Sequence, residues 1–130
     1  MTASVTNFIR SAIIYLAIGV TMGVLMVINP GWGASLRAAH THINLVGWVS
    51  MMIFGVGYHV LPRFRGKQLY SEGIATAQLI LVNIGLVGFA ILITLFAVYG
   101  GDTFRYGAAF FGAMQAVSFY LFIYNMLRTM

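Results

Sequence analysis

The chain has 130 residues, of which 61% are hydrophobic and only 7% charged, and its mean hydropathy is +0.93. A soluble globule needs more polar surface than this, so the composition excludes a soluble fold and indicates a single-domain, all-α integral membrane protein. Because the sequence has no cysteine, it excludes disulfides, thiolate metal sites and thiol catalysis. The net charge of +5 is spread over helix ends rather than gathered in a patch, so nucleic acid is not an expected partner.

Four apolar stretches are long enough to cross a hydrocarbon core, which takes about 20 helical residues. They are predicted at residues 8–28, 36–61, 74–99 and 104–127. Proline and glycine separate them, since both residues end helices. Within the first stretch, Gly19-x-x-x-Gly23 predicts a close crossing with a neighbouring helix.

The basic residues predict the orientation in the membrane. Four spans put both termini and the loop after the second span on one side. That side carries five basic residues and the other side two: Arg10, Arg63, Arg65, Lys67 and Arg128 against Arg37 and Arg105. The positive-inside rule therefore predicts cytoplasmic termini. The expected location is the cytoplasmic (inner) membrane of a bacterium or archaeon, with lipid as a direct partner.

All three histidines fall on the second predicted helix, His40 and His42 near its outer end and His59 near its inner end. Residues two apart on an α-helix point about 200° from each other, so His40 and His42 cannot bind one metal from the same helix. Each can instead be a ligand on its own face, and neutral imidazole is a common axial ligand of haem. Asn44 is the polar residue placed to hydrogen-bond His40. His59 lies about 28 Å along the helix from His40 and is more simply explained as an interfacial residue than as a ligand.

Several residues between positions 39 and 69 form a recognisable pattern: Ala39, His40, His42, Leu45, Gly55, His59, Pro62, Phe64, Gly66 and Leu69. The pattern resembles the tenth transmembrane helix of subunit I of haem–copper oxidases. In that family the first histidine of the pair holds the high-spin haem and the second the low-spin haem, which the resemblance assigns to His40 and His42. The segment Arg37-Ala-Ala-His40-Thr41 also resembles the second helix of nitric oxide reductases and the related cbb3-type oxidases, which supplies the other low-spin ligand.

The resemblance also implies an assembly. Subunit I of the oxidases has twelve helices in three arcs of four, so one chain corresponds to one arc. A closed homotrimer would rebuild the twelve helices, with His40 of one protomer facing His42 of the next and about one haem b at each interface. Arg37 is the first candidate partner of a haem propionate and Arg105 the second. A homodimer with haem between two His40 or two His42 residues is the alternative.

The leading functional hypothesis is a haem b-binding membrane cytochrome that transfers electrons in a respiratory chain, from quinol or to a periplasmic acceptor. Bis-histidine haem is coordinatively saturated, which favours electron transfer. Histidines matching the family's copper site are absent from residues 1–39 and 72–130, so enzyme activity stays uncertain. One alternative is a five-coordinate haem on His40, with His42 or His59 near a second metal, that binds or reduces nitric oxide or oxygen. Another is a haem-free metal-handling or assembly subunit.

Overall fold

The computed structural model describes residues 1–130, which form helices and no strand. The elements are α1 (Ala3–Ile28), α2 (Pro30–His42), the π-helical η1 (Ile43–Ser50), α3 (Met51–Phe64), α4 (Glu72–Tyr99) and α5 (Asp102–Thr129). Since α2, η1 and α3 run on without a break, the chain has four helices long and apolar enough to cross a membrane. The predicted all-α, four-span membrane protein is confirmed.

Two of the predicted helix starts were wrong. The first helix begins at Ala3 rather than residue 8, because the Thr2 hydroxyl accepts the N–H of Val5 and caps the helix. The second begins at Pro30 rather than residue 36, because proline needs no hydrogen-bond partner in the first helical turn. Pro62 lies inside the last turn of α3 instead of after it. The helices therefore extend into polar sequence beyond the apolar runs.

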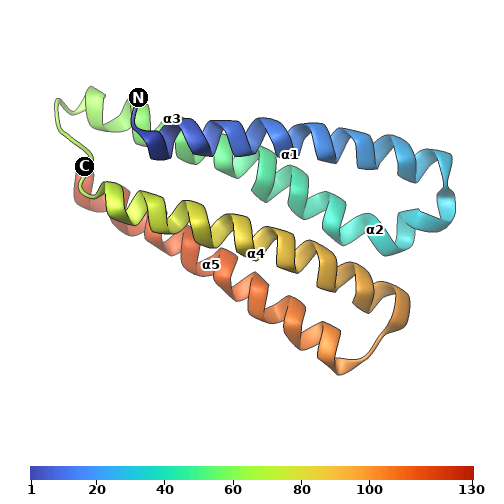
Figure 1. Cartoon of the computed structure of the whole chain (residues 1–130). Helices are drawn as coiled ribbons and strands as arrows, with labels where there is room; N and C mark the ends of the chain where they lie inside the picture. The colour runs from blue at the N-terminus through green and yellow to red at the C-terminus, as the bar shows by residue number, and fades with distance from the viewer.

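Both termini and the loop between α3 and α4 lie at one end of the molecule, here called the termini end (Figure 1). At this end α3 also packs against α5, where the ring of Phe54 lies 5.0 Å from that of Phe119 and 4.5 Å from that of Phe122. At the opposite end α2 lies between α1 and α4 and makes no contact with α5. There α5 packs only on α4. The bundle is therefore closed at the termini end and open at the other.

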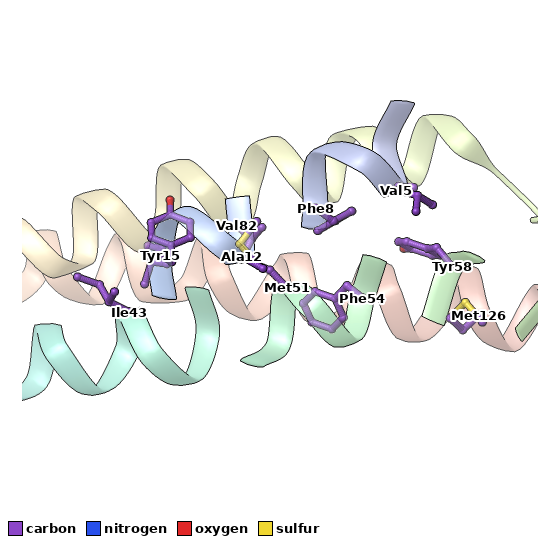
Figure 2. Close-up of a cluster of buried hydrophobic side chains, with 12 residues drawn as sticks. Val5, Phe8, Ala12, Tyr15, Ile43, Met51, Phe54, Tyr58, Val82 and Met126 are labelled. Atoms are coloured by element: carbon purple, nitrogen blue, oxygen red, sulfur yellow. The ribbon is translucent and has the colours of Figure 1, made fainter. Parts of the chain in front are cut away.

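A cluster of buried apolar side chains runs through the closed part of the bundle (Figure 2). Phe8 of α1 is fully buried in this cluster, with its ring 6.0 Å from Phe54 and 5.9 Å from Tyr58. Only 25 of the 130 residues are buried, and large apolar side chains such as Ile13 and Val27 are exposed. Outward-facing apolar side chains of this kind are expected where lipid replaces water around the helices.

The π-helical segment η1 keeps one face of the second span turned inward. Ala39, Ile43, Gly47 and Met51 are all buried, four residues apart. In a regular α-helix each step of four would rotate the side chain by about 40°, and three steps would carry it about 120° away. Because π-helical hydrogen bonds join residues five apart, each turn takes more than four residues and this drift is cancelled.

Gly47 sits at the centre of that inward face. A Cβ atom there would lie 2.7 Å from Cγ of Tyr15 on α1 and 2.9 Å from Cδ2 of Leu86 on α4. Only glycine leaves room for both side chains. This close approach positions α2, and with it the two histidines, between α1 and α4.

Candidate functional site

His40 and His42 lie in the last turn of α2, directly before η1, and their rings face different neighbours. His40 lies against α1, where a Cβ atom on Gly23 would be 3.3 Å from the imidazole Cε1. His42 lies against α4, with its ring centroid 4.1 Å from that of Phe89. Both histidines are half-buried. The structure therefore agrees with the prediction that one chain cannot bring both rings to one metal ion.

Asn44 holds the His40 ring, as the sequence predicted. The Asn44 Nδ2 group donates to the carbonyl oxygen of His40 at 2.8 Å and also contacts His40 Nδ1 at 3.2 Å. Since the backbone oxygen only accepts, the amide nitrogen must point this way, and its second hydrogen is left for Nδ1. This contact favours the tautomer in which Nδ1 accepts and Nε2 carries the hydrogen. In this arrangement Nε2 of His40 is a donor and not a metal ligand.

His42 has the opposite arrangement. Its Nδ1 lies 3.1 Å from the carbonyl oxygen of Ala38, which can only accept, so Nδ1 carries the hydrogen. Nε2 of His42 therefore keeps its lone pair. Histidines that bind metals commonly donate one ring N–H to a backbone carbonyl and bind the metal through the other nitrogen.

Two glycines of α1 make room for these polar side chains. A Cβ atom on Gly19 would lie 2.5 Å from Oδ1 of Asn44, and Gly23 lies beside the ring of His40. The close crossing predicted from Gly19-x-x-x-Gly23 is present. It places the Asn44 amide and the His40 ring directly on the backbone of α1.

The two arginines proposed for haem propionates lie in different surroundings. Arg37 is exposed on α2, one turn before His40 and Thr41. Arg105, however, lies on α5, which makes no contact with α2. Its guanidinium group forms an ion pair with Asp102 at 2.9 Å and lies over the ring of Tyr106. Within one chain the structure brings Arg37, and not Arg105, near the histidine pair.

His59 lies in α3, far along the same span, and contacts the guanidinium group of Arg63. The structure does not bring it near His40 or His42. No three histidine or acidic side chains gather into a group that could hold a metal ion.

Sequence reasoning missed the π-helical segment that begins one residue after His42. A signal was present in the four-residue spacing of the small and apolar residues Ala39, Ile43, Gly47 and Met51. The predicted distance between His40 and His59 assumed a uniform α-helix, which η1 interrupts. π-helical turns are rare and often occur at functional sites.

Fold and site together define a four-helix membrane protein with a half-buried histidine pair on one span. Comparisons with protein-family models, with curated proteins and with solved structures find no match.

Proposed function

We propose that this protein is a haem b-binding membrane cytochrome that transfers electrons, with haem held between protomers by His40 of one and His42 of the next. The observation that carries the proposal is the pair of rings on opposite sides of one helix, one of which, His42, has a free Nε2 lone pair. When bound, haem supplies a one-electron redox centre. The resemblance to oxidase subunit I supports the same ligands and a homotrimer rather than a dimer.

The residues of this chain would have separate tasks. The Ala38 carbonyl keeps His42 in the ligating tautomer. Asn44 keeps His40 in the other tautomer, so ligation by His40 requires the Asn44 amide to release Nδ1. Arg37 lies exposed next to the pair and would neutralise a haem propionate. Quinol or a periplasmic protein remains the proposed redox partner.

The test is a pyridine haemochrome assay and a redox difference spectrum of the gently purified protein. We expect low-spin haem b in the wild type, loss of haem in His40→Ala and in His42→Ala, and no change in the control His59→Ala. In the alternative dimer, with haem between two His40 or two His42 residues, only one of these two variants would lose haem. Co-expression of the His40→Ala and His42→Ala chains then tests whether the two ligands come from different protomers. In a ring, random mixing leaves about a quarter of the interfaces with both histidines, so part of the haem returns. Colourless wild-type protein from haem-sufficient cells would refute the proposal and favour a haem-free subunit.

A second function is favoured by one specific observation, the 3.2 Å contact between Nδ2 of Asn44 and Nδ1 of His40. If Asn44 does not release His40, His42 alone would hold the haem, and one coordination position would stay open to a ligand. Such a haem binds small gases such as carbon monoxide, nitric oxide or oxygen. Adding carbon monoxide to the reduced protein distinguishes the two, because a saturated bis-histidine haem leaves the spectrum unchanged and a five-coordinate haem shifts it.

A further inference from the structure

A pocket of about 520 Å³ opens at the termini end, between the start of α1, the end of α3 and the loop before α4. It lies at the opposite end of the second span from His40 and His42. Three basic side chains line it, His59, Arg63 and Lys67, together with one acidic side chain, Glu72. Its lining is thus predominantly basic.

Neither Arg63 nor Lys67 forms an ion pair with an acidic side chain. The one ion pair between side chains joins Arg105 and Asp102, so Glu72 forms none with Arg63 or Lys67 although it lines the same pocket. The guanidinium group of Arg63 instead contacts the ring of His59, which is itself basic. Lys67 Nζ donates to the main-chain oxygen of Met130 at 3.3 Å, at the edge of hydrogen-bond range, and this oxygen also accepts from Arg65 at 2.7 Å. Guanidinium and ammonium groups that no acidic side chain neutralises, gathered around one cavity, are groups that bind phosphate in proteins.

The inner wall of the pocket is apolar. Val5, Tyr58, Pro62 and Leu69 line it, and the first three are buried. Figure 2 shows Val5 and Tyr58 at this end of the buried cluster. A site that combines basic groups with an apolar wall at the end of membrane spans suits a phosphate group attached to acyl chains better than a free anion.

We propose that this pocket binds the phosphate group of an anionic phospholipid, with Arg63 and Lys67 as the contacting cations and His59 holding Arg63 in place. Each basic residue near an anionic membrane surface changes the affinity about fivefold, so removing Arg63 and Lys67 together should weaken binding about 25-fold. Phosphatidylcholine, which has a phosphate but no net charge, should bind much more weakly.

The experiment is native mass spectrometry of the full chain in detergent, counting bound phosphatidylglycerol and bound phosphatidylcholine. The variants are Arg63→Gln, Lys67→Gln and the double change. Arg10→Gln is the matched control, because it removes the same charge from an exposed position outside the pocket. We expect preference for phosphatidylglycerol in the wild type and in Arg10→Gln, and about fivefold loss in each pocket variant. Circular dichroism checks folding, and Arg63→Lys, which keeps the charge, should retain most of the binding.

Two results would overturn the proposal. Equal losses in Arg10→Gln and Arg63→Gln would mean that lipid responds to general charge and not to this pocket. Equal binding of the two lipids by the wild type would exclude a charge-selective site.

A further experiment adds inorganic phosphate as a competitor of the lipid. If it displaces phosphatidylglycerol at matched concentration, the lipid assignment is wrong and the pocket takes free phosphate.

Discussion

The contact between Gly19 and Asn44 gives a quantitative test of how the His40 ring is held. In Gly19→Ala the new methyl group would lie 2.5 Å from Oδ1 and 2.7 Å from Nδ2 of Asn44. Contacts this short are not tolerated, so the Asn44 side chain must turn away from α1. Turning away breaks both of its hydrogen bonds to His40.

The expected magnitude follows from those two bonds. Hydrogen bonds between side chains in membrane proteins average about 0.6 kcal/mol each, so their loss costs about 1 kcal/mol. Replacing glycine by alanine also stabilises a helix by up to about 1 kcal/mol. In the Gly19→Ala variant this gain partly offsets the loss of the two hydrogen bonds. The informative quantity is therefore the coupling energy between Gly19→Ala and Asn44→Ala. Without the Asn44 amide the new methyl group meets no obstacle, so the coupling should be about 1 kcal/mol or more.

The assay is reversible unfolding in mixed detergent micelles for the wild type, the two single variants and the double variant. Gly73→Ala combined with Asn44→Ala is the control, because a Cβ atom at Gly73 meets only Ser71 Oγ, at 3.6 Å, and shares no partner with Asn44. Its coupling should lie within the ordinary additivity error of about 0.5 kcal/mol. A Gly19–Asn44 coupling of that same small size would show that Asn44 does not lie against α1 as described.

Two further predictions concern the other helix contacts. Gly85→Ala should destabilise the α4–α5 pair by about 1–3 kcal/mol, because a Cβ atom there would lie 3.0 Å from the backbone oxygen of Phe111, which cannot move aside. In Gly73→Ala the nearest atom would be 3.6 Å away, so thermal unfolding should hardly change. Tyr58→Phe should cost about 1–3 kcal/mol in denaturant unfolding, because Gln78 is fully buried and loses the hydroxyl that donates to its Oε1 at 2.5 Å. Adding Gln78→Leu should recover most of this loss, and failure to recover would mean that the hydroxyl acts elsewhere.

The four spans could be predicted because long apolar runs have few alternatives to a membrane helix. Their starts could not, because Thr2 and Pro30 extend the helices through hydrogen bonding and backbone geometry that hydropathy does not measure. The π-helical segment Ile43–Ser50 was missed for a related reason. Gly47 within this segment packs between two other helices, and that packing is a property of the folded bundle.

The opposite directions of His40 and His42 followed from the helix period alone. Their tautomers did not, because these depend on which acceptor or donor lies beside each Nδ1 in the folded chain. The proposed role of Arg105 also depended on tertiary structure, since α5 diverges from α2 at the open end of the bundle (Figure 1). The pairing of Arg105 with Asp102 three residues earlier is the part that the sequence alone could indicate.

The π-helical segment also divides the second span into two halves, α2 and α3. The side chains of each half have their own orientation around the helix axis. The direction of His40 and His42 belongs to α2, whereas the aromatic packing of Phe54 and Tyr58 belongs to α3. A chain shorter by one residue within η1 would keep the packing of α3 but turn the histidines by about 100° around the helix axis. Both rings would then leave their places against α1 and α4. The number of residues in this segment thus sets the direction in which His40 and His42 point.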